Sequence, residues 1–399
     1  MNILKEFKSK IEWKNIDTPC YVYSEEILST SISRFTSIQY ENKKIYAATM
    51  ANNNSTILRL IRNLGINVFV NSELHFDKVL NCGFKGNEII YTSTAINEKL
   101  LKRLIREDVM INIDSLTQLE LYGTLNPRSN VGIRLNVAEF FLGNVSESVN
   151  NRIGINESEF KTVNEIAEKH NLTINGLHVY LGTDIIDFDY MKKSIIRTIS
   201  IAKKLDQLEY IDFGGGFPVQ GMYGEYFDYQ VYDEFITNQM NELSDFYNRS
   251  IQLIIEPGRS LFGESAIFLT KVLDIKERDN RFIICSDASV SIFPRSLFYD
   301  EYHEVVSLNE SNNRFDKKVD IVGHTTYSRD YLAKDLTNFP KQKIGDISCF
   351  NYAVSYCFSM LTQFLGQKVP KELMIDKKNT LINISDNLQA VRHEKEPFI

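Results

Sequence analysis

The stretch IDFGGGFP at residues 211–218 joins a short apolar strand to three consecutive glycines. Similar apolar runs recur along the first two thirds of the chain, and a longer stretch with helical periodicity follows each of them. The expected strands cover residues 44–50, 66–70, 88–92, 109–113, 131–136, 174–181, 209–214 and 253–258. Strands that alternate with helices in this way predict an α/β fold built on a parallel sheet.

The number of strands favours a (β/α)8 TIM-like barrel, a fold that typically needs about 250 residues. An open, doubly wound sheet has the same periodicity, so the pattern alone does not decide between them. Beyond residue 262, strand-like runs follow one another without long helices, which predicts a C-terminal β domain. The early strand-like stretch at 18–28 is assigned to that domain as well. We therefore expect a barrel over residues 30–262 and a β-sandwich or barrel domain from residues 1–29 plus 263–399.

Composition narrows the classes of partner. A formal net charge of -7 leaves no basic surface for nucleic acid. No apolar run approaches the roughly 20 residues that a membrane helix needs, and the N-terminus lacks the apolar core of a signal peptide. The five cysteines are scattered without a CxxC pair, which favours a reduced, cytoplasmic protein.

Candidate site residues lie where the barrel strands end, because functional groups of this fold gather at that face. Gly214, Gly215 and Gly216 let backbone N–H groups approach an anion without obstruction by a Cβ atom. The next strand ends in EPGR, which adds Gly258 and Arg259. The glycine loop alone is equally consistent with a tight turn, but the two neighbouring strand ends together predict a phosphate site.

Three further candidate site residues are identified by their positions in the expected strands. Glu256 ends an apolar strand and needs a partner, either a protonated ring nitrogen or Arg134. His178 and Tyr180 alternate along one strand, so both should face the barrel interior. A lone histidine in such a strand is more often a core residue than a ligand, and the six histidines show no metal-binding spacing, so the sequence does not support a metal site.

Several longer motifs resemble those of one family, the fold type III pyridoxal-phosphate decarboxylases that act on ornithine, diaminopimelate, arginine and carboxynorspermidine. They include IYAATMANNNSTILRLI, GLHVYLGTDI and EPGRSLFGESAIFLTKVLDIK, and the similarity runs from TPCYVYS at residue 18 to LQAVRHEKE at 388–396. The resemblance implies a barrel plus a β domain, as in alanine racemase, and a head-to-tail homodimer with a shared active site. It also implies pyridoxal 5'-phosphate as the cofactor.

The resemblance assigns roles to individual positions. The phosphate would be held by Thr183, Gly214, Gly215, Gly216, Gly258, Arg259 and Tyr356. Glu256 would pair with the pyridine nitrogen and keep the ring an electron sink, with support from Arg134. Asp330 would receive a substrate amine across the dimer.

The departures from the family pattern are equally specific. The lysine that bonds to the cofactor is replaced by Met50, or by Thr49 when the alignment follows Tyr46-Ala47, and neither can form that bond. Tyr180 replaces a ring-stacking histidine, and Thr326 replaces the cysteine that protonates the product. An aspartate and a glutamate of the family fall at Phe69 and His75.

Three functions fit this pattern. The first is a divergent decarboxylase that acts on a small amino-acid-derived substrate and holds the cofactor without a covalent bond. The second is a non-catalytic pseudoenzyme that serves as a regulatory dimer partner. The third is a repurposed enzyme that uses the barrel pocket without this cofactor for another phosphate-bearing or carboxylated ligand. Metal use belongs to this alternative, with His178, Glu256 and His324 as the candidate ligands.

Overall fold

The computed structural model describes residues 3–137, 152–222, 224–309, 311–353 and 355–386, so the LQAVRHEKE motif lies outside the described residues. The chain divides into two compact units. The barrel unit comprises Thr30–Asn53 and Arg59–Leu261, and the sheet unit comprises Met1–Ser29, Asn54–Leu58 and Phe262–Ile399.

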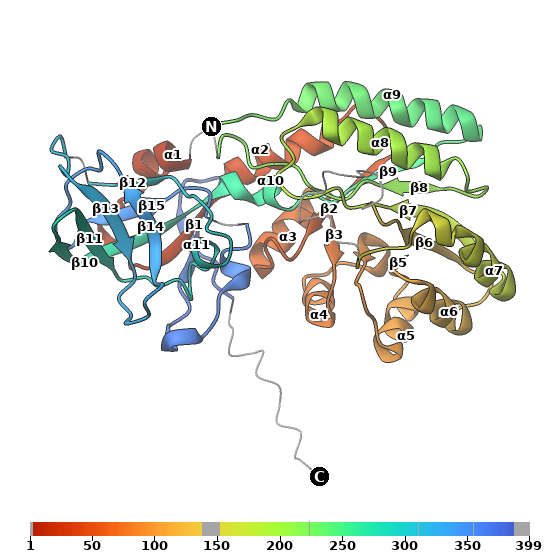
Figure 1. Ribbon diagram of the computed structural model, residues 1–399, viewed down its shortest axis with the longest axis horizontal. Coiled ribbons are helices and arrows are strands. Elements are labelled where there is room, and N and C mark those ends of the chain that lie inside the picture. Colours follow the sequence, from red (N-terminus) through yellow and green to blue (C-terminus); the bar gives the residue numbers. More distant parts are fainter. Residues whose placement is uncertain (1–2, 138–151, 223, 310, 354, 387–399) are drawn as a thin grey trace, which may run out of the picture. The chain divides into compact units, whose positions relative to one another are not determined.

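The barrel unit is a closed parallel barrel of eight strands in sequence order, which confirms the predicted fold class and excludes the open sheet (Figure 1). Its first and last strands close the ring, with Lys43 opposite Leu253. The strands are β2 (Lys43–Ala48), β3 (Asn67–Val70), β4 (Ile89–Tyr91), β5 (Met110–Ile113), β6 (Asn130–Arg134), β7 (Thr173–His178), β8 (Tyr210–Asp212) and β9 (Gln252–Ile255). Each is shorter than its apolar run, because the last residues of several runs turn into the loops of the site.

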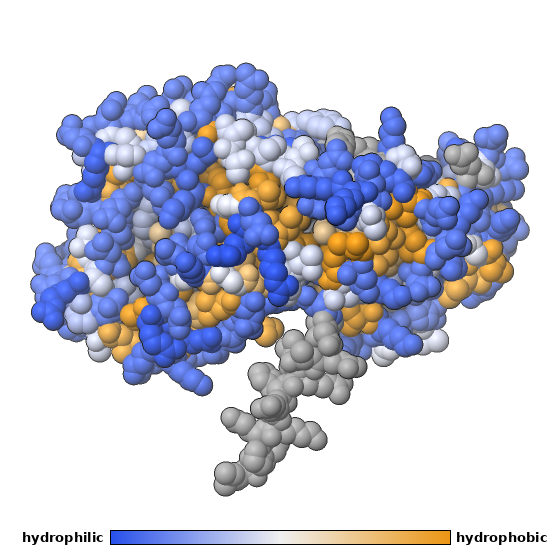
Figure 2. Space-filling view, turned by 180° about the vertical axis from the view of Figure 1, so that it is seen from behind, coloured by the Kyte–Doolittle hydropathy of each residue, from blue (hydrophilic) through white to orange (hydrophobic). Residues whose placement is uncertain are grey.

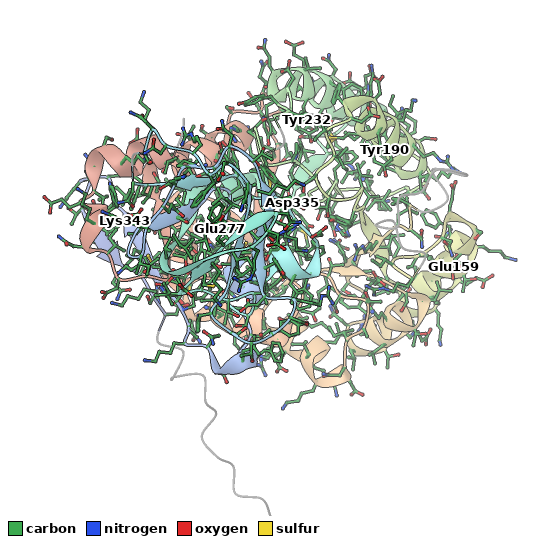
Figure 3. The ribbon with its side chains drawn as sticks, turned by 60° about the vertical axis from the view of Figure 1, so that its left-hand side comes forward. Glu159, Tyr190, Tyr232, Glu277, Asp335 and Lys343 are labelled. Atoms are coloured by element: carbon green, nitrogen blue, oxygen red, sulfur yellow. The ribbon has the colours of Figure 1, made fainter. Side chains whose placement is uncertain are left out.

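Helices follow the strands, as the periodicity predicts. They are α2 (Glu25–Thr36), α3 (Ser55–Asn63), α4 (Glu73–Asn81), α5 (Glu98–Arg106), α6 (Leu116–Leu125), α7 (Phe160–His170), α8 (Phe188–Ala202), α9 (Tyr229–Tyr247) and the short α10 (Arg259–Phe262). Figure 3 shows Tyr190 on α8 and Tyr232 on α9. The Tyr190 hydroxyl donates to the Leu181 carbonyl at 2.9 Å, which ties α8 to the loop after β7.

The interior of the barrel is filled by large side chains from alternating strands. Tyr210 is fully enclosed and its hydroxyl donates to Asn112 Oδ1 at 2.7 Å. Gly132 and Gly176 make room for it, because a Cβ at either position would lie within 2.0 Å of the Tyr210 ring or hydroxyl. This packed layer closes the lower barrel and leaves polar chemistry to the carboxyl ends of the strands.

The sheet unit contains a nine-stranded mixed sheet. Its strands are β1 (Cys20–Ser24), β10 (Ala266–Glu277), β11 (Arg281–Ser286), β12 (Val305–Ser307), β13 (Lys318–Val322), β14 (Tyr331–Leu336), β15 (Ile347–Phe350), β16 (Lys371–Ile375) and β17 (Leu381–Asn383), with helices α1 (Ile3–Lys10) and α11 (Arg295–Phe298). Strand β1 pairs antiparallel to β10 and parallel to β16, which explains why the early stretch belongs with the late strands.

Residues Asn54–Leu58 cluster with the sheet unit although they follow the first barrel strand. The Asn54 side chain donates to Glu372 Oε2 at 2.8 Å and to the Ile384 carbonyl at 2.9 Å. Because these bonds fix the start of α3, the boundary between the units differs here from the expected one.

The face in Figure 2 is mostly hydrophilic, with smaller hydrophobic areas between the charged residues. Among the described residues, no helix combines the length and the apolar character that a bilayer crossing requires.

Candidate functional site at the barrel mouth

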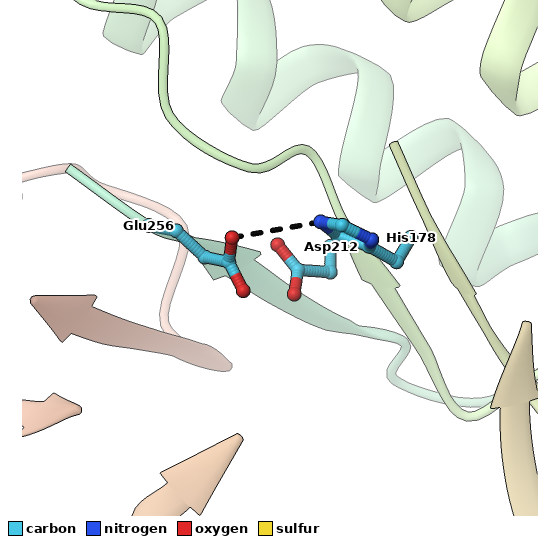
Figure 4. A group of neighbouring side chains, drawn as sticks. All are labelled: His178, Asp212 and Glu256. Atoms are coloured by element: carbon cyan, nitrogen blue, oxygen red, sulfur yellow. Dashed lines mark ion pairs between the residues drawn. The ribbon is translucent and has the colours of Figure 1, made fainter. Parts of the chain in front are cut away.

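Three buried side chains meet at the carboxyl ends of adjacent strands. His178 ends β7, Asp212 ends β8, and Glu256 directly follows β9. One nitrogen or oxygen atom from each of the three side chains lies within 4.8 Å of those of the other two, and His178 Nε2 is 3.5 Å from Glu256 Oε2 (Figure 4). All three residues are at most 5% exposed. The barrel topology therefore concentrates two acids and an imidazole in one enclosed space.

Burial determines the charge of this group. It lowers the pKa of His178 to about 4, so the imidazole is neutral at physiological pH. It raises the pKa of Asp212 well above its usual range and that of Glu256 to about 7. The two carboxyl groups therefore share a proton near neutral pH, with Asp212 the preferred carrier.

Four buried polar atoms of this group lack a hydrogen-bond partner among the described residues: Glu256 Oε1, Asp212 Oδ2 and the two ring nitrogens of His178. Glu256 Oε1 is buried and accepts no hydrogen bond, whereas Asp212 Oδ1 accepts from the Gly214 backbone N–H at 2.9 Å. The nearby Arg134 guanidinium pairs with Asp114 at 3.4 Å, not with Glu256 at salt-bridge distance, so the predicted Glu256–Arg134 pair is not formed. Glu256 Oε1 therefore remains available as an acceptor for a hydrogen-bond donor.

The glycine loop lies beside these acids. The Gly214 carbonyl accepts from the Glu256 backbone N–H at 2.8 Å, which joins the loop to the end of β9. No described residue accepts a hydrogen bond from the backbone N–H groups of Gly215 and Gly216. Two donors in adjacent positions of a glycine turn form the kind of concavity that binds an anion.

Gly215→Ala is expected to lower the free energy of unfolding by about 2 kcal/mol, because its Cβ would lie 2.6 Å from the Glu256 carbonyl oxygen. The control is Gly65→Ala, where the Cβ meets open space and only the positive φ of 78° is unfavourable, at a cost of about 1 kcal/mol. Urea unfolding of both variants measures the difference. Equal losses would show that the loop tolerates a side chain.

Tyr180 and Arg259 border the loop. The Tyr180 hydroxyl lies 2.5 Å from Thr183 Oγ1, and both residues follow β7. Arg259 begins α10 and is 6% exposed. Its guanidinium forms an ion pair with the Asp184 carboxylate. Thr183, the glycine loop and Arg259 thus lie in neighbouring turns of the barrel unit, and the arginine already has a carboxylate partner. The predicted phosphate role of these residues stays a prediction.

The ends of β2 and β3 carry a neutral hydrogen-bonded network. The Thr49 hydroxyl donates to the Phe69 carbonyl at 2.9 Å and lies 3.2 Å from His75 Nδ1. Asn53 Nδ2 lies 3.3 Å from His75 Nε2. Burial lowers the pKa of His75, which keeps the imidazole neutral. Met50 follows Thr49 in the same turn, half-buried, so the position offers a thioether in place of an amine.

The remaining predicted residues belong to the sheet unit. Thr326 and His324 are exposed, and His324 Nδ1 donates to the Ala288 carbonyl at 3.0 Å. Tyr356 has a φ of 66°, and the Arg295 guanidinium lies 5.6 Å from the centre of its ring. Asp330 is 3% exposed and accepts from the Val290 backbone N–H at 2.8 Å and from Thr325. These hydrogen bonds indicate that Asp330 stabilises its own loop. They favour this structural role over the predicted role of binding a substrate amine.

Asp330→Ala is expected to cost about 2 kcal/mol of folding stability, because the buried Val290 N–H would lose its acceptor. Asp330→Asn keeps an acceptor oxygen and should lose less. Denaturant unfolding of both variants measures the effect. A role in substrate binding alone would leave the stability of both variants unchanged.

Comparisons with known proteins agree with this arrangement. Residues 28–263 match the family model described as pyridoxal-dependent decarboxylase, pyridoxal binding domain. The chain belongs to this family. It is 28% identical over 385 residues to a diaminopimelate decarboxylase of Buchnera aphidicola, with 92% of this chain and 91% of the relative covered. A second such enzyme, from Aquifex aeolicus, is 24% identical, with 94% of each chain covered.

Solved structures share the fold. The diaminopimelate decarboxylase of Helicobacter pylori complexed with L-lysine superposes with a TM-score of 0.83 at 23% identity, covering 94% of this chain and 95% of that one. The M. jannaschii enzyme in co-complex with L-lysine gives a TM-score of 0.85 at 21% identity and covers 96% and 91% of the two chains. The expected architecture, a barrel with a separate β domain, is therefore confirmed.

Members of this family are pyridoxal-phosphate-dependent carbon–carbon lyases, and the barrel residues fit the cofactor in part. The unpartnered Glu256 Oε1 suits a protonated ring nitrogen, and the N–H groups of Gly215 and Gly216 suit a phosphate. Thr49 and Met50, the two positions to which the resemblance assigns the family's lysine, carry no amine.

Some participants were not predicted from the sequence. Asp212 lies two positions before Gly214 and was taken only as part of the strand, although an acid at a strand end is a recognisable signal. Asp114 directly follows the expected strand 109–113 and carries the same signal, whereas Asp184 does not. Asp114 and Asp184 each pair with an arginine, which lies 20 or 75 positions away in the chain.

Proposed function

We propose that this protein binds pyridoxal 5'-phosphate reversibly at the barrel mouth and decarboxylates a small substrate derived from an amino acid. The observation that carries the proposal is the buried, unpartnered oxygen of Glu256. Asp114 and Arg134 neutralise each other, His178 is neutral, and Asp212 holds a proton. A cationic N–H donor at Glu256 would complete the charge balance of the interior.

The chain's own residues would divide the work. Glu256 would accept a hydrogen bond from the pyridine nitrogen, and Arg134, held by Asp114, would contribute a nearby positive charge. The glycine loop would bind the phosphate, and Tyr180 would lie against the ring. When bound, pyridoxal phosphate supplies an aldehyde that captures an amine and a ring that accepts the electrons of a breaking carbon–carbon bond.

The absence of a lysine changes how the ligand is retained. Met50 supplies no amine, so binding would depend on polar contacts and on ring packing alone. The substrate class follows from the similarity to diaminopimelate decarboxylases, which supports an amino acid with its carboxylate at the reacting carbon. The free cysteines support a reducing compartment such as the cytoplasm.

The proposal includes a homodimer. Thr326, Tyr356 and Asp330 lie in the sheet unit, whereas Glu256 lies in the barrel unit. An active site shared between two copies would use both sets, as the sequence resemblance implies. Sedimentation of the purified protein tests this part, and a monomer at all concentrations would contradict it.

A second candidate function has one specific observation in its favour. His178, Asp212 and Glu256 together could hold a divalent cation, since imidazole and carboxylate ligands suit zinc. This trio replaces the trio with His324 that was considered from the sequence. A metal-assisted enzyme of this kind would bind zinc tightly and pyridoxal phosphate weakly.

The test is to titrate the purified protein, first dialysed against chelator, with pyridoxal phosphate and with zinc, and then to assay CO2 release from a panel of amino acids. Saturable cofactor binding and CO2 release from one amino acid would support the proposal. Cofactor binding without turnover would support the pseudoenzyme. Zinc binding without cofactor binding would support the metal-assisted alternative.

A further inference from the structure

Arg259 stands where a barrel of this kind binds phosphate. It follows the eighth barrel strand, and the glycine loop follows the seventh, which is the usual place for a phosphate site. Its guanidinium is buried and already has a carboxylate partner. Arg259 Nε lies 2.9 Å from Asp184 Oδ1 and 2.8 Å from Asp184 Oδ2, and Nη2 lies 3.5 Å from Met222 Sδ.

The backbone holds Asp184 in this position. Its φ of 50° is in the left-handed region, which aspartate tolerates better than most residues. The next residue, Ile185, donates its N–H to the Gly216 carbonyl at 2.8 Å. A Cβ on Gly216 would lie 2.8 Å from the Gly182 carbonyl oxygen, so the two turns are in direct contact. The backbone on both sides of Asp184 therefore packs against the glycine loop, which fixes the residue that carries the carboxylate.

The two side chains differ in their access to solvent. The Arg259 side chain is 5% exposed, whereas the Asp184 side chain is 21% exposed. An incoming anion would meet the carboxylate on the open side of the pair. A phosphate dianion and this carboxylate cannot both occupy the same guanidinium without strong repulsion.

We infer that Asp184 is a specificity-determining residue that competes with the ligand's phosphate for Arg259 and so sets the affinity of the site for phosphorylated ligands. This inference rests on the proposed function, because it concerns the ligand of the same barrel mouth. A ligand that lacks a phosphate does not compete with Asp184. The ratio between the affinities for phosphorylated and unphosphorylated ligands thus reports on this residue.

The test compares Asp184→Asn with the wild type. Asparagine adopts the same left-handed backbone and removes only the charge. The control is Asp187→Asn, which removes the same charge from an exposed position in the same loop, where Asp187 caps α8 through the N–H groups of Asp189 and Tyr190. Calorimetric titration with pyridoxal phosphate, pyridoxal and inorganic phosphate measures each affinity.

The expected result is that Asp184→Asn binds pyridoxal phosphate and inorganic phosphate about tenfold tighter than the wild type, as expected for the loss of one close like charge. Its affinity for pyridoxal should stay unchanged, and Asp187→Asn should bind all three as the wild type does. Equal or weaker phosphate affinity in Asp184→Asn would overturn the inference and make the pair structural.

The inference and the proposed function fail in different ways. If inorganic phosphate binds tighter to Asp184→Asn but pyridoxal phosphate binds to neither protein, the competition stands and the proposed cofactor is wrong. If the wild type binds pyridoxal phosphate and Asp184→Asn gains nothing, the cofactor stands and the competition is wrong. Asp184→Gly, which also tolerates the positive φ, repeats the measurement without an amide at this position.

Discussion

Met50→Lys is expected to convert reversible binding of pyridoxal phosphate into stoichiometric covalent attachment. The position follows the first barrel strand, at the same barrel mouth as Glu256 and the glycine loop, and the introduced amine would supply the group that this chain lacks. Borohydride reduction followed by intact-mass measurement detects the covalent product. The wild type should gain no stoichiometric label under the same conditions.

Thr49→Lys is the matched control, because the alternative alignment places the family lysine there. Thr49 is 1% exposed and its hydroxyl is bonded to the Phe69 carbonyl, so a lysine at this position would have to bury its charge. We expect this variant to lose about 3 kcal/mol of stability and to gain no label. Labelling of Thr49→Lys but not of Met50→Lys would show that the alignment on Tyr46-Ala47 is the correct one.

Glu256→Gln is expected to stabilise the protein without ligand and to weaken its binding of the cofactor. The pKa of Glu256 is raised from its ordinary 4.5 to about 7, so the folded state takes up a proton that the unfolded state releases. Stability is therefore greatest below the ordinary pKa and falls as the pH rises through about 7. The full loss is about 3 kcal/mol, and the uncharged glutamine avoids it.

Urea unfolding of the wild type and of Glu256→Gln between acidic and mildly alkaline pH measures this difference. The gap between the two proteins should widen as the pH rises, because only the wild type must ionise a buried acid. Glu165→Gln removes an exposed acid on α7 and should change stability by less than about 0.5 kcal/mol at any pH. A difference in unfolding free energy that stays constant with pH, or a Glu256→Gln variant less stable than the wild type, would contradict the prediction. It would show that burial does not destabilise the ionised form of Glu256.

The same variant separates stability from function. Loss of the charged acceptor should weaken pyridoxal phosphate binding by about tenfold to a hundredfold, the usual range for a hydrogen bond to a charged group. A residue that lowers stability yet strengthens ligand binding is typical of a functional site. If Glu256→Gln binds the cofactor as tightly as the wild type, Glu256 is not the partner of the ring nitrogen.

Much of the fold could be predicted because its signals are local. The eight apolar runs from 44–50 to 253–258 each became a barrel strand, and the change of rhythm after residue 262 marks the sheet unit. Strands β12, β14, β15 and β16 were not predicted. Strand β12 has three residues and β15 has four, so their sequence signals are short. Strand β15 pairs with both β10 and β12, and this pairing, rather than the strand propensity of its residues, determines its structure.

In the candidate site, too, residues with a local sequence signal could be predicted, whereas contacts made only in the folded chain could not. Residues at strand ends, such as Glu256 and Gly215, could be predicted because the barrel brings all strand ends to one face. The partner of Arg259 could not, because Asp184 lies 75 positions earlier and only the closed barrel places the two together. Asp330 could be aligned with a family position, but its hydrogen bonds to Val290 and Thr325 depend on the folded loop.

The most direct test of the central claim is the equilibrium binding of pyridoxal phosphate to the wild-type protein, measured by calorimetry and followed by dialysis. We predict saturable binding with one site per barrel, complete loss of the ligand on dialysis, and a weaker affinity in Glu256→Gln. If no saturable binding occurs at millimolar concentration, the barrel mouth does not hold this cofactor and the proposed function is wrong.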